Sequence, residues 1–305
     1  MNGILVIDKP AGITSHDVVS RVRRILKTKR VGHTGTLDPF ATGVMVILVG
    51  QATRLAQFLD KDVKEYEALV RFGFETDTGD RTGTKRDAEA AGRGDAVSEA
   101  EIEKKLIDFR GEIEQTPPMY SAKKIDGKKL YELARKGETV ERKPVMVNIF
   151  EIELLGSEPP AVAGGLTQPI DTIKIRVKCS AGTYIRTLAE DIGRKIGTGA
   201  HLEELRRTVA GKFGLDQSIT LEELDDLPEP ISELIAMEEV VSHLASLIIN
   251  DDRIAKTRNG LSTRVIDANF KDGDAIQMLD TNGNLVAIGF FDAAENIVQP
   301  KVVLV

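Results

Sequence analysis

The stretch Gly32-His33-Thr34-Gly35-Thr36-Leu37-Asp38-Pro39 separates two apolar runs of the chain. Its glycines permit positive φ angles or the close approach of a ligand, and Pro39 restricts the backbone at its end. A carboxylate in such a loop, here that of Asp38, can be directed at a substrate. It can equally cap backbone N–H groups in an ordinary turn, because Asp and Gly are common turn residues. The stretch therefore indicates a loop before a buried element and leaves both roles open for Asp38.

The sequence on either side of this loop predicts a mixture of strands and helices. The run Gly43–Gly50 is continuously apolar, which predicts a strand buried on both faces. Gly3–Asp8 predicts a strand, and Ser15 is the expected N-cap of a helix with apolar residues three and four apart. Further strands are predicted at 66–72, 145–155 and 173–179, and helices at 52–60, 98–109, 130–134, 183–196 and, as two short ones, 220–240. From about residue 246, short apolar runs alternate with turns, which predicts a small β-rich domain that needs support from its neighbour.

The composition is that of an ordinary globular protein, with 41% hydrophobic and 29% charged residues in a chain of 305. No apolar run approaches the roughly 20 residues that span a bilayer, and the N-terminus reaches Asp8 too early for a signal peptide. The single Cys179 can form no internal disulfide, which fits a reducing cytosol. No paired Cys or His spacing predicts a metal site, and no glycine-rich nucleotide motif predicts a cofactor. We therefore expect a cytoplasmic chain with no membrane contact, no metal and no cofactor.

Charge is distributed unevenly along the chain, although the net charge is −7. Residues 1–60 carry eight Lys and Arg against four acids, and residues 115–145 carry the same numbers. Residues 217–250 carry eight acids and no Lys or Arg. Two local excesses of +4 are compatible with nucleic-acid binding on one face of the protein. Solvated helix faces produce the same pattern, so each basic cluster alone leaves both interpretations open.

Several separated segments together resemble the TruB family of pseudouridine synthases, the bacterial tRNA pseudouridine-55 synthases. In chain order the matching segments are Asp8–Ser15, Gly32–Val44, Lys64–Tyr66, Thr76–Asp80, Gln115–Lys124, Cys179–Leu188 and Leu205–Thr208. Any one segment could match by chance, but their common order and spacing could not. The resemblance implies an α+β fold with a catalytic domain in residues 1–245, built on a mixed, largely antiparallel sheet with flanking helices. It also implies a small β-rich, PUA-like RNA-binding domain in residues 246–305.

The resemblance further implies a reaction, the isomerisation of one uridine in the T-arm of tRNA, at position 55, to pseudouridine. The ribose C1′–N1 bond breaks, the base turns and C1′ rejoins to C5, a problem similar to glycoside cleavage. Asp38 resembles the family's essential aspartate, and both attack on C1′ and proton abstraction from C2′ stay open for it. Arg186 resembles the arginine that pairs with this aspartate and keeps it ionised. A cation in the first turn of a helix itself favours a buried anionic partner, because the helix dipole disfavours it there.

Other residues are expected around the substrate because they match positions of the family. Tyr66 resembles the aromatic residue that stacks on the flipped base and takes part in proton transfer, although a strand tyrosine needs no such role. Tyr184 and Leu205 occupy positions similar to family residues that contact the nucleotide or shape its pocket. His33 has such a position too and could fill the space that the flipped base leaves.

Residues 115–145 resemble the insertion with which this family grips the T-loop. Lys123, Lys124, Lys128 and Lys129 are expected to contact phosphates, which positions RNA without reading its sequence. The acidic stretch 217–250 is then expected to lie away from the RNA. The partner that the resemblance implies is tRNA, bound by a monomer that needs no protein partner.

Three other functions stay open at this point. A relative directed by a guide RNA within a larger particle is disfavoured by the 115–145 insertion and the short C-terminal domain. A tRNA-binding or folding chaperone without chemistry would not need Asp38, Tyr66 and Arg186 together. A small-molecule glycosidase needs a second catalytic carboxylate at a defined separation, and the sequence points to none.

Overall fold

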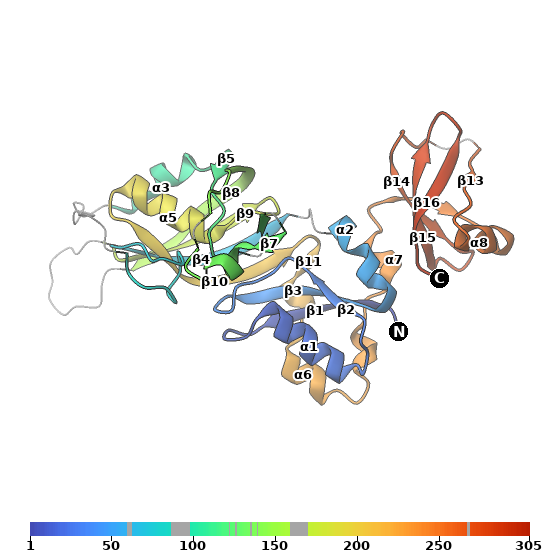
Figure 1. Ribbon diagram of the computed structural model, residues 1–305, viewed down its shortest axis with the longest axis horizontal. Helices are drawn as coiled ribbons and strands as arrows, with labels where there is room; N and C mark the ends of the chain where they lie inside the picture. Colours follow the sequence, from blue (N-terminus) through green and yellow to red (C-terminus); the bar gives the residue numbers. More distant parts are fainter. Residues whose placement is uncertain are drawn as a thin grey trace.

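The computed structural model describes residues 1–59, 63–86, 98–121, 123–125, 127–134, 136–138, 140–158, 170–266 and 269–305, without the side chains of residues 124, 125 and 129. Within these ranges the chain forms one large sheet, a smaller sheet from its C-terminal part and a two-stranded ribbon (Figure 1). Helices lie against both larger sheets. The predicted α+β architecture is therefore confirmed.

The large sheet has the strand order β1-β3-β10-β4-β9-β8-β5, with β2 beside β3 and β11 beside β10. Its strands are β1 Gly3–Lys9, β2 Val31–Thr34, β3 Thr42–Val49, β4 Lys64–Phe72, β5 Gly111–Gln115, β8 Val145–Glu158, β9 Thr172–Cys179, β10 Ala200–Ala210 and β11 Phe213–Gly214. Strands β3 and β10 are parallel, and the other described pairs of this sheet are antiparallel. The sheet is mixed and largely antiparallel, as predicted.

The β1–β3 half of this sheet is buried on both faces. Helices α1 (Ser15–Ile25) and α6 (Leu221–Asp226) pack against one face, where Val22 and Leu224 meet Ile47 of β3. On the other face Val46 of β3 belongs to a buried cluster with Leu55, Phe213 and Val240, and this cluster extends to Ile288 of the C-terminal part. Burial on both faces explains the uninterrupted apolar run of this strand, as the sequence predicted.

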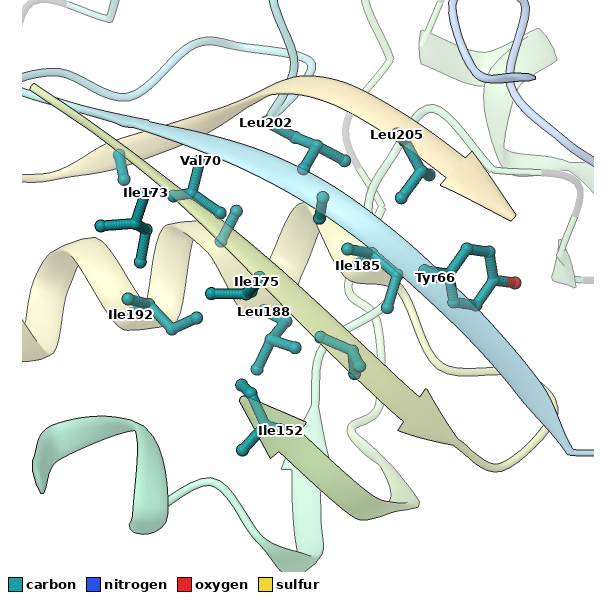
Figure 2. Packing of buried hydrophobic residues seen from close by; sticks show 14 of the residues in the cluster. Tyr66, Val70, Ile152, Ile173, Ile175, Ile185, Leu188, Ile192, Leu202 and Leu205 are labelled. Atoms are coloured by element: carbon teal, nitrogen blue, oxygen red, sulfur yellow. The ribbon is translucent and has the colours of Figure 1, made fainter. Parts of the chain in front are cut away.

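The β4–β9–β8 half is covered on one face by α3 (Glu99–Ile107) and α5 (Ile185–Ile196). Figure 2 shows Leu188 and Ile192 of α5 against Ile175 of β9 and Val70 of β4. The opposite face is polar, with cross-strand ion pairs such as Arg176–Glu153 at 2.7 Å. One buried and one solvated face match the alternation of apolar and polar residues along these strands.

The start of α1 differs from the prediction. Thr14, and not Ser15, is the N-cap, because its hydroxyl accepts from the Asp17 N–H at 3.1 Å and the Asp17 carboxylate accepts from the Thr14 N–H at 2.9 Å. This reciprocal capping box satisfies two backbone donors at once. Ser15 is thereby the first helical residue, which frees its hydroxyl for a contact outside the helix.

The C-terminal sheet has the order β12-β14-β15-β16-β13. Its strands are β12 Ala245–Ile248, β13 Thr263–Arg264, β14 Ala275–Leu279, β15 Leu285–Asp292 and β16 Ile297–Val303, and helix α8 spans Asp251–Arg258. Apolar side chains of β15 and β16 belong to the same cluster as those of β1 and β3. The guanidinium of Arg54 also donates to the carbonyl of Val303. The smaller sheet therefore has the support from its neighbour that its size requires.

The acidic region lies against part of the basic N-terminal cluster. Arg21 and Arg24 of α1 face Glu222 and Asp225 of α6 at 3.3 Å and 3.8 Å. The remaining helices and short strands are η1 Gly50–Leu55, α2 Ala56–Leu59, β6 Lys124–Ile125, β7 Lys128–Lys129, α4 Leu130–Ala134, η2 Leu215–Gln217, η3 Pro230–Glu233 and α7 Met237–Val240. In the parts of the chain given above, no helix combines the length and the apolar character needed to cross a membrane.

Candidate active site

Asp38 lies in the loop between β2 and β3, and residues at the end of β1 and the start of α1 hold this loop. The buried ammonium of Lys9 donates to the carbonyl oxygen of Ala41 at 2.7 Å. The Ser15 hydroxyl donates to the Leu37 carbonyl at 3.0 Å and accepts from the Leu37 N–H at 2.9 Å. The backbone on both sides of Asp38 is therefore fixed, which is what a side chain held in one direction requires.

Arg207 of β10 holds the beginning of the same loop and is 1% exposed. Its Nε donates to the carbonyl of Val44 at 2.6 Å, and its Nη2 donates to that of Gly35 at 3.0 Å. Gly35 has a φ of 68° and approaches Arg207 so closely that an added Cβ would lie 3.2 Å from its Nη1. A side chain at this position would strain the loop. Arg207 also lies opposite Tyr66 of β4 in the sheet register.

Arg186 binds the Asp38 carboxylate with two nitrogens. Its Nε lies 2.9 Å from Oδ2 and its Nη2 lies 3.2 Å from Oδ1, and only 6% of its side chain is exposed. Such a paired contact fixes the plane of a carboxylate as well as its position. Arg186 is the second residue of α5, and the carboxamide of Gln115 anchors the start of this helix through the Tyr184 N–H at 2.9 Å and carbonyl at 3.2 Å.

The outer side of the Arg186 guanidinium is also surrounded by oxygens. Its nitrogens donate to the carbonyls of Thr78 at 2.9 Å and Tyr120 at 2.7 Å, and the Asp80 carboxylate lies 3.6 Å away. Asp80 is 4% exposed and accepts from the Thr82 N–H at 2.9 Å. Arg186 thus joins the candidate catalytic carboxylate to two segments that are distant in sequence.

The charge of Asp38 depends on these neighbours. The pKa of its carboxyl lies above the usual range, because burial together with the Asp80 carboxylate outweighs the lowering by the Arg186 guanidinium and the Lys9 ammonium. About a third of the side chain, 32%, is exposed, on the side that opens onto a pocket. Arg186 therefore opposes the effect of burial and favours the ionised form at a position open to a ligand.

The pocket over Asp38 and Arg186 brings together residues from five separate segments. Tyr66, Tyr184, Leu205 and Lys123 belong to its lining, together with Lys64, Ser121 and Arg207. The Ser121 hydroxyl is buried and has no hydrogen-bond partner within the described part of the chain. His33 lies half-buried on β2 and is not among the lining residues, so its contact with the nucleotide stays a prediction.

Tyr66 lies at the end of the hydrophobic cluster under α5, with its hydroxyl pointing away from the other side chains (Figure 2). It is 8% exposed. Burial raises the pKa of its phenol, and the nearby Arg207 guanidinium lowers it. The ring is therefore fixed by packing, while its edge reaches the pocket.

The 115–145 insertion begins at Gln115, the last residue of β5, and ends at Val145, the first residue of β8. These two residues are paired with each other in the sheet. Lys128 is exposed, which suits a phosphate contact, and Lys123 is half-buried at the pocket. The backbones of Lys124 and Lys129 pair in the β6–β7 ribbon, but their side chains lie outside the description. The structure thus brings one of the four lysines to the pocket.

Several residues around Asp38 received no role in the sequence analysis. They are Lys9, Ser15, Lys64, Asp80, Ser121 and Arg207. Each lies within a segment that matches the family, which was the available signal. Nothing in the linear sequence showed that their partners would be backbone carbonyls of another segment.

No metal-binding arrangement is found in the described ranges, where no three His, Cys, Asp or Glu side chains converge suitably. Cys179 is buried, and burial raises the pKa of its thiol to about 11. It is therefore a packing residue of β9 and not a nucleophile at neutral pH.

Comparison with known families was made over the whole chain. Residues 23–185 match the family described as TruB family pseudouridylate synthase (N terminal domain), and residues 186–247 match the tRNA pseudouridylate synthase B C-terminal domain. The chain belongs to the TruB family. Among its relatives are the tRNA pseudouridine synthases B of Solibacter usitatus, 43% identical with 100% of both chains covered, and of Bacillus subtilis, 40% identical with 100% of this chain and 98% of the relative covered.

Two solved structures have a similar fold. One is the structure of an H/ACA RNP bound to a substrate RNA containing 2′-deoxyuridine, with a TM-score of 0.73 and 28% identity. Another is a Cbf5-Nop10-Gar1 complex, with a TM-score of 0.73 and 30% identity. Each similarity covers 99% of this TruB-family chain and 85% of the other chain.

Proposed function

We propose that the chain is an isomerase that converts uridine in tRNA, at position 55 of the T-arm, to pseudouridine. The observation that carries the proposal is the Asp38 carboxylate, held by the buried Arg186 at 2.9 Å and 3.2 Å and open to a pocket. The names of its full-length relatives, tRNA pseudouridine synthase B, support the same reaction.

In the proposed reaction the target uridine leaves its stack, which costs a few kcal/mol, and enters the pocket. Tyr66 stacks on the flipped base, Leu205 and Tyr184 enclose it, and His33 fills the space it leaves. Asp38 acts at the ribose, by attack on C1′ or by removal of a proton from C2′, while the C1′–N1 bond breaks. The base turns and C5 bonds to C1′. This step breaks the Asp38–C1′ ester on the first route, whereas on the second route Asp38 returns the proton to C2′. The C5 proton then leaves and N1 takes up a proton, so that the product is an isomer.

Different parts of the chain have different roles in the proposed function. Residues 1–245 carry the reaction, the 115–145 insertion grips the T-loop through Lys123, Lys124, Lys128 and Lys129, and residues 246–305 add RNA contacts. The chain acts as a monomer without a protein partner or cofactor. Because tRNA is the substrate, we place the reaction in the cytoplasm.

The test is incubation of the purified chain with an unmodified tRNA transcript, followed by chemical mapping of pseudouridine by primer extension. Asp38→Asn is expected to lower the rate by about 10⁴-fold or more while binding persists, because the acting carboxylate is lost and the shape is kept. The matched control is Asp108→Asn, which breaks only an exposed contact with Lys195 and keeps turnover.

The same assay separates the other functions. Modification that requires an added guide RNA or protein would show a guided enzyme. Binding without any modification would show a chaperone. Turnover by Asp38→Asn at the wild-type rate would refute the assignment of Asp38.

A further inference from the structure

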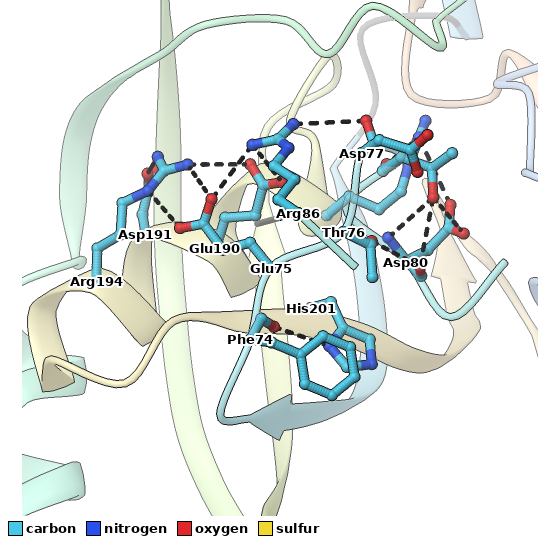
Figure 3. Close-up of polar contacts among 12 residues, drawn as sticks. Phe74, Glu75, Thr76, Asp77, Asp80, Arg86, Glu190, Asp191, Arg194 and His201 are labelled. Atoms are coloured by element: carbon cyan, nitrogen blue, oxygen red, sulfur yellow. Dashed lines mark hydrogen bonds and ion pairs between the residues drawn. The ribbon is translucent and has the colours of Figure 1, made fainter. Parts of the chain in front are cut away.

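Helix α5 carries further charged side chains that the proposed reaction does not use. Glu190 and Arg194 follow Arg186 at intervals of four residues, so the three side chains lie along one face of the helix. Residues 73–86, here called the α5 loop, pass over this face (Figure 3). The loop contributes Thr78 and Asp80 to the surroundings of Arg186.

A cluster of charges joins the α5 loop to the helix. Arg194 binds the carboxylate of Glu75 with two nitrogens, Nε at 2.7 Å and Nη2 at 2.9 Å, and lies 3.2 Å from Asp191. Arg86, at the other end of the loop, lies 3.2 Å from Glu75 and 3.8 Å from Glu190. Two guanidinium groups thus lie among three carboxylates, and we call these five residues the α5 charge cluster (Figure 3).

These contacts differ from ordinary surface ion pairs. Only 17% of the Glu75 side chain and 13% of the Glu190 side chain are exposed. Burial raises the pKa of Glu190, and Arg86 and Arg194 lower it. A paired guanidinium–carboxylate contact in a network with partly buried partners is the geometry in which an ion pair holds two segments together.

Hydrogen bonds join the two arms of the α5 loop, so that a displacement of its base is transmitted to its tip. The Arg86 N–H donates to the Glu75 carbonyl at 2.9 Å, and the Asp77 N–H donates to the Thr84 carbonyl at 3.0 Å. The Asp77 carboxylate accepts from the Thr84 N–H at 2.8 Å. The base of the loop, at the α5 charge cluster, and its tip therefore move together.

The tip of the loop lies directly against Arg186. The Thr78 carbonyl accepts from Arg186 at 2.9 Å. Gly79, with a φ of 74°, is so close to the helix that an added Cβ would lie 3.1 Å from Glu190 Oε1 and 3.4 Å from Arg186 Cβ. Glu190 thus contacts the loop beside the residue that binds Asp38.

We propose that Arg194, with Glu75, is a positioning pair for the reaction: it clamps the α5 loop to the helix, so that the Thr78 carbonyl and Asp80 hold Arg186 in line with Asp38. This inference rests on the proposed function. Arg194 and Glu75 touch neither the pocket nor Asp38, so they act on the reaction through Arg186 alone. Loosening the clamp shifts Arg186 and thereby misplaces the Asp38 carboxylate, while Lys123 and Lys128 of the insertion have no contact with the clamp.

The experiment compares wild type, Arg194→Met, Glu75→Gln and the double variant in single-turnover assays on the tRNA transcript, with Kd measured on the same RNA. Each single change is expected to lower the rate roughly tenfold with an unchanged Kd. The double variant is no slower than the slower single one, because both break the same contact. Arg194→Lys recovers part of the rate. Arg176→Met is the matched control, since it breaks a similar pair with Glu153 on the polar sheet face and leaves the rate unchanged.

A second readout separates positioning from loss of folding. Asp38 faces Arg186 from α5, Asp80 from the α5 loop and Lys9 from β1. A loosened Arg186 lowers the pKa of Asp38 less, so the acid limb of the rate profile of Arg194→Met moves to higher pH. A purely structural role moves the unfolding midpoint and leaves this limb in place.

Three results would overturn the inference. One is a wild-type rate in a folded Arg194→Met. Another is a rate loss that is explained by weaker RNA binding and a smaller salt slope, which would make Arg194 an RNA contact. The third is a rate loss without movement of the acid limb. An inactive wild-type chain would instead refute the proposed function, which the same assay reports separately.

Discussion

Lys9 shows at the scale of one residue how the Asp38 loop is held. Its ammonium is buried and donates to three carbonyl oxygens, those of Pro10 at 2.9 Å, Pro39 at 3.2 Å and Ala41 at 2.7 Å. Its three N–H groups thus match three acceptors. Burial lowers the pKa of Lys9 to about 8, while the Asp38 carboxylate raises it. Burial of the Lys9 ammonium therefore costs free energy of folding, while its three hydrogen bonds fix the backbone of the Asp38 loop.

This lowered pKa predicts a dependence of stability on pH. The folded chain loses the Lys9 proton near pH 8, whereas the unfolded chain keeps it to about pH 10.5. Between these values the unfolded state binds more protons, so the contribution of Lys9 to the free energy of unfolding rises with pH, by about 3 kcal/mol in all. Urea unfolding of wild type and Lys9→Met from pH 7 to 10 measures this difference, because other groups titrate equally in both. A difference that stays flat over this range would contradict the prediction.

The insertion between β5 and β8 shows how an element is brought over the pocket. Three contacts hold its first part: Gln115 to Tyr184, Arg142 to the Pro117 carbonyl at 3.0 Å, and Arg186 to the Tyr120 carbonyl. The Asp38 carboxylate and the insertion therefore share Arg186. This coupling explains how the insertion also contributes to the lining of the candidate active site.

Lys123 and Lys128 are the two residues with described side chains among the four lysines expected to contact phosphates. Replacing both by Ala is expected to weaken tRNA binding. The slope of log Kd against log salt should fall by about 1.5, because the variant makes two fewer phosphate contacts and its binding releases fewer counterions. Filter binding at several salt concentrations measures the slope. Lys104→Ala, an exposed lysine on α3, is the control with an unchanged slope. An unchanged slope in the double variant would assign both lysines to solvent.

The whole molecule is held together by a core that the two sheets share. Val46 of β3 and Ile288 of β15 belong to one buried cluster, although more than two hundred residues separate them. In Figure 1 the C-terminal sheet lies beside α2 and α7, and the shared cluster connects it to the strand that follows the Asp38 loop. The packing of this cluster depends on both parts of the chain.

Such a shared core predicts coupled unfolding. Ile288→Ala is expected to lower the free energy of unfolding by about 2–5 kcal/mol, because it leaves a cavity in a fully buried position. The four tyrosines, Tyr66, Tyr120, Tyr131 and Tyr184, all lie outside the C-terminal sheet, and the chain has no Trp. Tyrosine fluorescence in urea therefore reports the large-sheet part, and its midpoint should fall. Ile266→Ala, at a position 81% exposed, serves as the control. An unchanged midpoint in Ile288→Ala would show that the two parts unfold separately.

Much of the architecture was readable from local pattern, but several strands of the large sheet were not predicted, among them β2, whose Gly32–Thr34 were expected in a loop, β5 and the central β10. Their short or strongly charged sequences lack a clear apolar period. The start of one helix was also misplaced. The apolar run 43–50 and the alternation in 66–72 correspond to β3 and β4 because burial on one or two faces leaves a direct periodic trace. The N-cap was placed at Ser15 instead of Thr14, because both hydroxyls fit the pattern and only the position of the Asp17 carboxylate decides between them. The position of Arg186 in the first turn of a helix, where the helix dipole disfavours a cation, indicated an anionic partner from the sequence alone.

The sequence by itself determined most of the strands and helices, the family and the residues expected to carry the reaction, since each of these has a local pattern or matches a motif. Only the tertiary structure decided which charges are buried and what they hold: Lys9 and Arg207 on loop carbonyls, and Arg194 on Glu75. The physical reason is that burial of a cation depends on acceptors supplied by distant segments. From the sequence alone a lysine or arginine is expected at the surface, because only the fold shows whether acceptors lie close enough to bury it.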